Sequence, residues 1–277
     1  MKKPANKKLA FNYNRVENIS TLIRKVMAPN PSPFTLYGTG TFIVGKNQLC
    51  IIDPGPKIES HIKNILKVVG KNLVSHILIT HTHADHSPAA SVLKNITGAR
   101  TYAFDSYPKG IEGSRFEEAH DKEFMPDERL KDNETVSSKE WTIRAIHTPG
   151  HTSNHLCYSL EEEKALFTGD HVMGWATTVI VPPDGNMDDY VSSLKKILLG
   201  RHSLYYPTHG EPIKNPEKYV RGLIAHRKMR EVQILDELKK NSLTVNQMLP
   251  RFYSTTDKRL WPAASMSLLA TLLSLKK

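Results

Sequence analysis

The sequence predicts an α/β layered domain followed by a small helical domain. Short apolar runs alternate with amphipathic helical stripes as far as about residue 213, and beyond that point only helical patterns occur. The chain has 277 residues, which suits either two domains or one large domain with an appendage. We therefore expect one domain over residues 1–214 and a second over residues 215–277.

The predicted strands are short apolar runs with turn residues at their ends. The tripeptide Gly45-Lys46-Asn47 separates two such runs and predicts a β-hairpin. The run at 74–80 is apolar almost throughout, which is typical of a buried strand. We expect strands at residues 41–44, 49–53, 74–80, 101–104, 141–146, 156–160, 165–168 and 204–206. The segment 110–138 is polar and mixed in charge, so we expect it to run over the surface.

The predicted helices have apolar residues three and four positions apart. The stripe at 58–69 ends at Gly70, a common helix stop. Ser87-Pro88 is typical of a helix start. Asp188 and Asp189 fall in the first turn of a later stripe, where the helix dipole favours acidic residues. We expect helices at residues 58–69, 87–96, 187–199, 216–240, 244–252 and 263–275.

Composition excludes several classes of protein. Hydrophobic residues make up 39% and charged residues 24%, which rules out a mainly disordered or collagenous chain. The two cysteines, Cys50 and Cys157, predict a reduced setting without a disulfide scaffold or a thiolate metal cluster. No run of about 18 apolar residues occurs, and no apolar stretch follows the basic start at 1–8. We therefore expect no membrane span, no signal peptide and a cytoplasmic location.

The net charge of +10 is concentrated at the C-terminal end. Residues 215–277 contain twelve Lys/Arg and five Asp/Glu, a net charge of +7, and the rest of the chain contributes +3. Such an excess is typical of a solvated helix face, which is the interpretation that we favour. A nucleic-acid-binding surface is the alternative interpretation.

The strongest chemical signal is the segment Thr80-His81-Thr82-His83-Ala84-Asp85-His86, at the end of a predicted strand. A chain that leaves a strand is still extended, so His81, His83 and Asp85 can point to one side. Burial of these groups without partners would cost several kcal/mol. Zn²⁺ or a similar metal ion offers compensation, because imidazole and carboxylate are its usual ligands. A polar turn is the alternative.

Three further predicted strands are followed by a potential ligand next to a glycine. These ligands are His151, Asp170 and His209, and each alone is also typical of an ordinary turn. Together with the first segment they make seven candidates: His81, His83, Asp85, His86, His151, Asp170 and His209. Seven ligands are too many for one tetrahedral zinc. They suit two metals that share Asp170, with open positions for water.

This order and spacing resemble the metallo-β-lactamase superfamily. The family motif is H-x-H-x-D-H, followed by a distal His, a bridging Asp and a last His, and all seven positions are filled here. The resemblance implies a four-layer αββα sandwich with the metals at one edge of the sheets. It implies one metal on His81, His83 and His151, a second on Asp85, His86 and His209, and Asp170 as the bridge.

Residues 30–39 and 219–235 further resemble the subgroup of β-lactamase-like protein 2. In that subgroup a small winged-helix-like domain follows the catalytic domain. Lys277 comes directly after the last predicted helix, so we expect the wing to be missing here.

The resemblance implies a dinuclear-metal-dependent hydrolase. Two cations lower the pKa of a bridging water, so that a metal-bridging hydroxide attacks an ester, thioester, lactone or lactam. The same cations stabilise the charge that develops on the substrate oxygen. Asp85 is the expected catalytic residue, because it can orient the nucleophile besides binding a metal. Two Zn²⁺ ions are the expected cofactors, with iron or manganese as alternatives.

Several residues beside the motifs are candidates for supporting roles. Asp53 matches the family's early Asp-x-Gly turn and is expected to orient a ligand, although it could only cap the turn. Asn154, His171 and His226 are candidates to line the pocket, with a structural role as the alternative for each. His155 is a further candidate of this kind, with a structural or surface role as the alternative. Trp175, Thr177 and Thr178 are candidates to shape the substrate cleft, with core packing as the alternative.

The substrate stays open at this point, because the metal motif is generic. A small-molecule hydrolase is one hypothesis. A single-strand-preferring endoribonuclease is the second, which the subgroup resemblance and the basic C-terminal segment both favour. The third is a metal-bearing protein that binds RNA without cutting it. The oligomeric state is not predicted.

Overall fold

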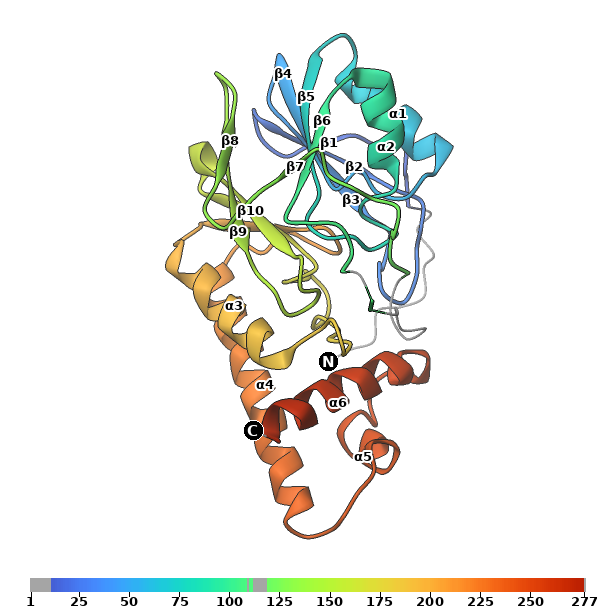
Figure 1. The fold of residues 1–277 in the computed structure, drawn as a ribbon, viewed down its shortest axis with the longest axis vertical. Helices are drawn as coiled ribbons and strands as arrows, with labels where there is room; N and C mark the ends of the chain where they lie inside the picture. The colour runs from blue at the N-terminus through green and yellow to red at the C-terminus, as the bar shows by residue number, and fades with distance from the viewer. Residues whose placement is uncertain (1–10, 109, 112–118, 277) are drawn as a thin grey trace.

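The chain folds into two packed β-sheets with helices on both outer faces, and a further group of helices follows (Figure 1). The computed structural model describes residues 11–108, 110–111 and 119–276. The basic segment 1–8, on which the expectation about a signal peptide rests, lies outside the described residues.

The first sheet has seven strands in the order of the chain. They are β1 (Glu17–Asn18), β2 (Ile23–Met27), β3 (Gly40–Val44), β4 (Gln48–Ile52), β5 (Leu73–Leu78), β6 (Arg100–Ala103) and β7 (Glu128–Arg129). β3 and β4 pair antiparallel as the predicted hairpin. β4, β5, β6 and β7 run parallel to one another, so the carboxyl ends of β4 and β5 meet at one edge of the sheet.

The second sheet has five strands in the order β12-β11-β10-β9-β8. They are β8 (Thr135–Ser137), β9 (Thr142–His147), β10 (Leu156–Leu160), β11 (Ala165–Gly169) and β12 (Leu204–Pro207). β8 to β11 form an antiparallel meander, and β12 joins β11 in parallel. The carboxyl ends of β11 and β12 therefore also lie together.

The helices begin and end close to the positions that the sequence predicts. They are α1 (Glu59–Val69), α2 (Ala89–Thr97), α3 (Met187–Leu199), α4 (Pro216–Leu238), α5 (Val245–Phe252) and α6 (Trp261–Leu275), with short 3₁₀ turns η1 (Glu161–Glu163) and η2 (Lys258–Leu260). The Asn186 side chain caps α3 by accepting hydrogen bonds from the backbone N–H of Asp188 and Asp189. Thr244 and Gln247 form a reciprocal capping box at the start of α5.

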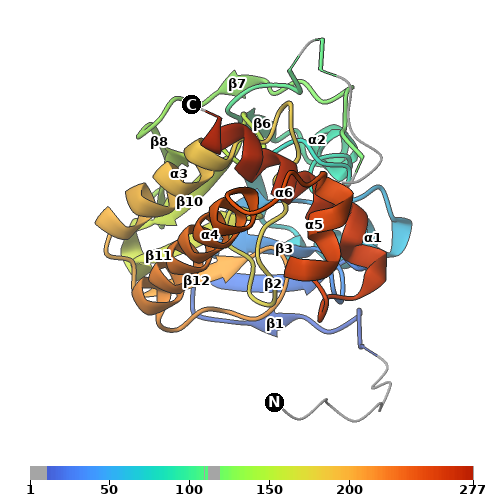
Figure 2. The ribbon, with the colours of Figure 1, turned by 90° about the horizontal axis from the view of Figure 1, so that it is seen from below.

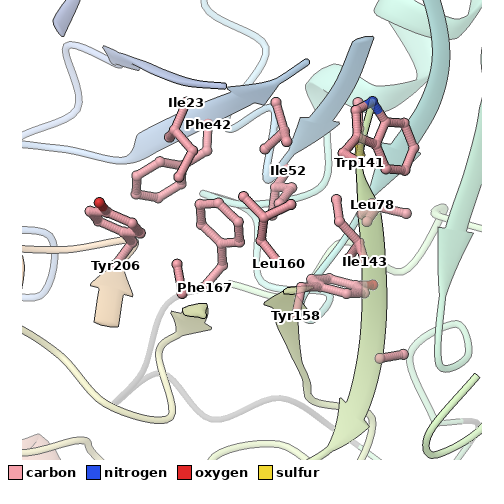
Figure 3. Packing of buried hydrophobic residues seen from close by; sticks show 14 of the residues in the cluster. Ile23, Phe42, Ile52, Leu78, Trp141, Ile143, Tyr158, Leu160, Phe167 and Tyr206 are labelled. Carbon is pink, nitrogen blue, oxygen red and sulfur yellow. The ribbon is translucent and has the colours of Figure 1, made fainter. Parts of the chain in front are cut away.

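Three apolar layers define the αββα sandwich. Along β3, Phe42 and Val44 face the second sheet, whereas Ile43 between them faces α1 and α2. The centre is filled by aromatic side chains, and Figure 3 shows Phe42 and Phe167 packed together between the sheets, with ring centroids 4.9 Å apart. On the other side, Leu166 of β11 packs with α3 and α4. The expected four-layer sandwich is thus confirmed.

The C-terminal helices extend this architecture at one end of the molecule (Figure 1), and this end faces the viewer in Figure 2. The first half of α4 packs on the second sheet through Val220 and Leu223, beside α3. Its second half packs through Ile234 against Met248 of α5 and Leu268 of α6. We call α4, α5 and α6 together the helical extension. Within it, α4 packs against both the sandwich and the other two helices. Among the described helices, none is long and apolar enough to cross a bilayer.

Four of the described strands were not predicted. β2 lies in the apolar-rich segment 19–28, for which the sequence pattern indicated no particular element. β7 and β8 lie within 110–138, the segment expected to run over the surface, and β1 precedes β2. These three have two or three residues each, and their side chains are exposed or partly exposed. Such strands lack apolar alternation, because backbone pairing at a sheet edge needs no apolar side chain.

Candidate metal centre

The seven predicted ligands all follow strand ends on one edge of the sandwich. His81, His83, Asp85 and His86 lie between β5 and α2. His151 lies between β9 and β10, whereas Asp170 and His209 directly follow the parallel neighbours β11 and β12. All seven side chains belong to residues that are at least nine-tenths buried.

Three histidines form a first group. The Nδ1 atom of His83 lies 2.8 Å from Nε2 of His81 and 3.1 Å from Nε2 of His151. One ring nitrogen from each of the three residues therefore points to a common position. Nitrogen atoms bound to one tetrahedral zinc at 2.0–2.1 Å would lie about 3.3 Å apart, which is close to this arrangement.

A carboxylate and two histidines form a second group. Oδ2 of Asp85 lies 3.0 Å from Nε2 of His209 and 3.5 Å from Nε2 of His86. These three atoms also satisfy the spacing of a metal site. The two groups are those that the family resemblance implies.

Asp170 lies between the two groups and faces both. Its Oδ2 atom is 3.8 Å from Nε2 of His151 in the first group. Its Oδ1 atom is 3.3 Å from Nε2 of His209 and 3.5 Å from Nε2 of His86 in the second group. The two oxygens of one carboxylate are thus directed to two adjacent positions, as a bridging ligand requires.

The outer ring nitrogens of His151 and His209 show which nitrogen of these two rings carries the lone pair when the ring is neutral. Nδ1–H of His151 donates to the carbonyl of Val179 at 2.8 Å, and Nδ1–H of His209 donates to the carbonyl of Gly38 at 3.0 Å. In the neutral ring Nε2 then keeps a lone pair directed inward. The carbonyl groups therefore orient the rings for a cation at the centre.

Asp53 lies next to the second group and holds His86 and the adjacent loops by hydrogen bonds. Its carboxylate accepts hydrogen bonds from the Thr80 backbone N–H, the Thr80 hydroxyl and the Thr208 hydroxyl, at 2.8, 2.8 and 3.0 Å. It also accepts a 2.9 Å hydrogen bond from Nδ1–H of His86, whose Nε2 then faces Asp85 and Asp170. Asp53 is fully buried and joins the loops after β4, β5 and β12.

The pKa directions around Asp85 and Asp170 indicate that this part of the site favours a positive charge. Burial alone would raise the pKa of Asp170, but His209 and His86 hold it well below its ordinary value. Burial likewise opposes ionisation of Asp85, and the facing His86 and His209 nevertheless lower its pKa to about 2. For His209, burial lowers the pKa, and the stronger combined effect of Asp170 and Asp85 raises it.

The donor set fits metal ions on two observations. First, Asp85 Oδ1, His86 Nε2 and Asp170 Oδ1 are buried and have no hydrogen-bond partner among the described residues. Buried polar atoms are otherwise nearly always satisfied. Second, His209 Nε2 lies 3.0 Å from an oxygen of Asp85 and 3.3 Å from an oxygen of Asp170, so two buried carboxylates converge where a positive charge, from a protonated ring or a metal ion, is needed. Imidazole and carboxylate ligands suit Zn²⁺, iron and manganese.

A cavity of about 260 Å³ adjoins the first group. His83, His151 and Asp170 form one end of it. Most of the wall is apolar and includes Phe34 and Met173. The helical extension forms one side of the cavity, with residues of α4, α6 and the α5–α6 loop in its lining: His226, Arg227, Tyr253, Thr256, Leu260, Ala263, Ala264 and Ser267.

Three hydrogen bonds hold the segment after Asp170 against the C-terminal helices. The Tyr219 hydroxyl donates to the Met173 carbonyl at 2.8 Å, and Arg227 Nη2 donates to the Thr178 carbonyl at 2.5 Å. The backbone N–H of Ile180 donates to the Ser267 hydroxyl at 3.0 Å. The cavity is thus built jointly by the β11–α3 loop and the helical extension.

The supporting residues predicted from the sequence lie in different places. His226 lines the cavity, as do Trp175, Thr177 and Thr178. Asn154 instead donates hydrogen bonds to the Thr82 hydroxyl and the Ser106 carbonyl, and lines a separate depression.

The two other histidines beside the motifs lie behind the ligands. His171 is fully buried against Tyr190, and burial lowers its pKa to about 3. His155 accepts a 3.3 Å hydrogen bond from the Asp170 backbone N–H at Nε2 and so supports the loop of the bridging residue. Neither lines the cavity.

Sequence reasoning assigned no role in the site to Arg227, which lies in the cavity wall. The spacing of apolar residues along α4 could have indicated that Arg227 is buried. Val220, Leu223 and Ile234 of α4 form a buried stripe, and Arg227 falls in the same stripe. A basic residue at a buried position of an amphipathic helix is unusual.

Comparison with known proteins identifies relatives of this chain. Residues 35–209 match the family model described as Metallo-beta-lactamase superfamily. The chain is 29% identical over 259 residues to the lactamase-like protein ptaB of Pestalotiopsis fici, covering 89% of this chain and 77% of that protein. It is 32% identical over 251 residues to the atrochrysone carboxyl ACP thioesterase dmxR1 of a Cryptosporiopsis species, covering 84% of this chain and 72% of that protein.

Solved structures show the same fold. A beta-lactamase domain protein from Burkholderia ambifaria has a TM-score of 0.78 at 19% identity, over 98% of this chain and 91% of that chain. A metallo-beta-lactamase family protein from Thermus thermophilus has a TM-score of 0.73 at 19% identity, over 92% of this chain and 94% of that chain. Both matches extend over more than nine-tenths of this chain, so they include most of the C-terminal helices.

Proposed function

The chain belongs to the metallo-beta-lactamase superfamily and is a metal-dependent hydrolase, and from this premise we propose that it cleaves the thioester of a small acyl group. The observation that carries hydrolysis is the bridging position of Asp170, whose two oxygens face two separate ligand groups. The thioester preference is supported by relatives named as thioesterases and by the apolar cavity beside the centre.

We propose two Zn²⁺ ions, with iron or manganese as alternatives. His81, His83 and His151 would hold one ion, Asp85, His86 and His209 the other, and Asp170 both. Metal ions at such a site supply a lowered pKa for water and polarise the substrate oxygen. Elemental analysis of the purified protein measures the identity and number of the ions.

The chain's own residues perform the remaining tasks. The apolar wall of the cavity excludes water from the acyl group and orients its carbonyl toward the end formed by His151 and Asp170. Asp85 Oδ1 has no hydrogen-bond partner among the described residues, so it is available to accept a proton from the attacking water and pass it to the leaving thiolate. The acyl group then leaves as a carboxylate.

The basic C-terminal segment gives less support to RNA cleavage. Arg221, Lys228 and Arg251 are engaged in ion pairs with Glu217, Glu231 and Glu237. These pairs leave fewer basic side chains of the helical extension free to bind phosphates, although the net charge of +7 already counts the acidic partners. RNA cleavage, RNA binding, a winged-helix role and a cytoplasmic location therefore stay predictions from the sequence.

The test is hydrolysis of benzoyl-N-acetylcysteamine by the metal-loaded protein, followed through the released thiol with a chromogenic disulfide. Cys50 and Cys157 are fully buried, so background reaction from the folded protein is small. We expect Asp170→Asn to lower kcat/KM at least about 100-fold, because the bridging ligand is lost. Asp236→Asn is the matched control, since Asp236 is exposed on α4 and pairs only with Lys239 among the described residues.

Two outcomes would contradict the proposal. Full activity in Asp170→Asn excludes the bridging role of this carboxylate. Cleavage of single-stranded RNA in a parallel assay, with no thiol released from any thioester, assigns the site to the nuclease hypothesis instead.

A further inference from the structure

Arg227 is a buried cation without a carboxylate partner among the described residues. Its side chain belongs to α4 and the residue is only 8% exposed. Nη2 donates to the Thr178 carbonyl, and the guanidinium carbon lies 5.1 Å from the centre of the Tyr190 ring. The ion pairs of this helix that the structure describes involve its neighbours instead.

Burial of the Arg227 charge, unpaired among the described residues, destabilises the fold, and Arg221 and Lys228 on the same helix do not carry this penalty. A buried charge without a counter-charge destabilises a fold by several kcal/mol unless a partner arrives. Arg221 and Lys228 on the same helix pair with Glu217 and Glu231, and both are exposed. Arg227 Nε, in contrast, has no hydrogen-bond partner among the described residues. A neutral side chain would pack in this stripe at lower cost.

A molecule bound in the cavity could supply the negatively charged partner that Arg227 lacks among the described residues. Arg227 lines the same cavity that His151 and Asp170 close at the metal centre. Trp175 Nε1 and His226 Nδ1 belong to side chains in that lining, and neither atom has a hydrogen-bond partner among the described residues. Three side chains of the lining thus each have a nitrogen without a hydrogen-bond partner among the described residues, and Asp170 is the single carboxylate that the described residues contribute to the lining.

We propose that Arg227 binds a carboxylate of the substrate, with Trp175 and His226 as additional hydrogen-bonding groups. The substrate class is then an ω-carboxyacyl thioester, whose thioester carbonyl lies at the metal centre and whose second, anionic end reaches Arg227. This assignment rests on the proposed thioester hydrolysis. A guanidinium recognises a carboxylate through paired, charge-assisted hydrogen bonds, which explains an arginine at this buried position.

The kinetic test compares two series of N-acetylcysteamine thioesters. One series runs from succinyl to suberoyl and ends in a carboxylate, and the other has the same carbon numbers and ends in a methyl group. For the ω-carboxyacyl length that the wild type prefers, we expect Arg227→Gln to raise KM about 10- to 100-fold, the loss expected for a hydrogen bond to a charged group. The methyl-ended partner should change less than about 3-fold in KM, a difference that ordinary surface substitutions also produce.

Two further variants separate recognition from a structural role. Arg227→Gln also weakens the contact with Thr178, so a structural role would impair both series equally. Arg227→Lys keeps a positive charge and should restore part of the preference for the carboxylate series. Lys228→Gln is the matched control, because Lys228 is the next residue, is exposed and pairs with Glu231. We expect its kinetics to equal those of the wild type.

A binding measurement distinguishes failure of this inference from failure of the proposed function. Calorimetry with adipate and hexanoate needs no turnover, and both ligands present one carboxylate to the metal centre. Tighter binding of adipate that is lost in Arg227→Gln supports the inference even if no thioester is cleaved. Thioester cleavage without any Arg227-dependent preference between the two series overturns it.

Discussion

Asp53 shows how one buried carboxylate can control the geometry of a metal centre. It is not among the seven ligands, yet it accepts hydrogen bonds from Thr80, Thr208 and His86. The hydrogen bond to Nδ1–H of His86 fixes both the ring orientation and the tautomer. This geometry supports the orienting role predicted for Asp53 over a turn cap alone.

At the residue scale, we expect Asp53→Asn to weaken metal binding. An amide retains one acceptor oxygen and replaces the other by an NH₂ group, which cannot accept from the Nδ1–H of His86. Loss of such an outer partner typically lowers metal affinity about 10- to 100-fold. Titration of Zn²⁺ against a competing chromogenic chelator measures the change.

The control for this variant is Asp236→Asn on the exposed surface of α4. An unchanged zinc affinity in Asp53→Asn, in a protein that is still folded by circular dichroism, would show that Asp53 serves only the turn after β4.

At the scale of elements, the start of α3 holds the loop that carries His151. The Asn186 backbone N–H donates to the Gly150 carbonyl, and the Ser193 hydroxyl donates to the Pro149 carbonyl. Gly150 has φ = 136°, and a Cβ atom there would lie 2.4 Å from the backbone nitrogen of Tyr190. Only glycine lets the loop approach the helix this closely.

We therefore expect Gly150→Ala to displace the His151 loop from α3. The free energy of unfolding should fall by about 2–4 kcal/mol, combining backbone strain with a steric clash. Zinc affinity should fall as well, because His151 moves with the loop. Urea denaturation and the chelator titration measure the two effects.

Gly98→Ala is a matched control that measures backbone strain without a steric clash. Gly98 ends α2 with φ = 73°, but a Cβ atom there meets nothing within 4 Å. Its variant should lose about 1–2 kcal/mol and keep its zinc affinity. Equal losses in both variants would show that close approach of the His151 loop to α3 has no role.

At the scale of the whole molecule, the sandwich and the helical extension share a hydrophobic layer. Val220 and Leu223 of α4 and Ala270 of α6 pack in one cluster with residues of α3 and the second sheet. The cavity beside the metal centre is also lined from both parts. A division at residues 214/215 remains a prediction about chain organisation, and this shared layer couples the two parts energetically.

We expect the two parts to unfold together. Leu223→Ala should lower the free energy of unfolding by about 2–4 kcal/mol, because a buried leucine side chain is lost from the shared layer. Urea unfolding followed by circular dichroism and by tryptophan fluorescence should shift as one transition. A shift confined to one of two separate transitions would show that the extension folds independently.

Much of the fold could be predicted because local patterns and tertiary packing agree. The helices and most of the longer strands follow apolar periodicity, which records the face that each element buries. β1, β7 and β8 escaped prediction since they are short and polar. Their pairing depends on the neighbouring strand, which no local pattern describes.

By itself, the sequence determined the residue types of the metal centre and their place at strand ends, because His, Asp and Gly motifs follow apolar runs in a fixed order. Only the tertiary structure placed Asp170 between two ligand groups and lined the adjoining cavity with residues of α4 and α6. It also decided that Arg227 lies buried with no carboxylate partner among the described residues, although acidic residues occur on the same helix. The reason is physical: charge compensation depends on distances between segments far apart in the chain, and these exist only once the layers have packed.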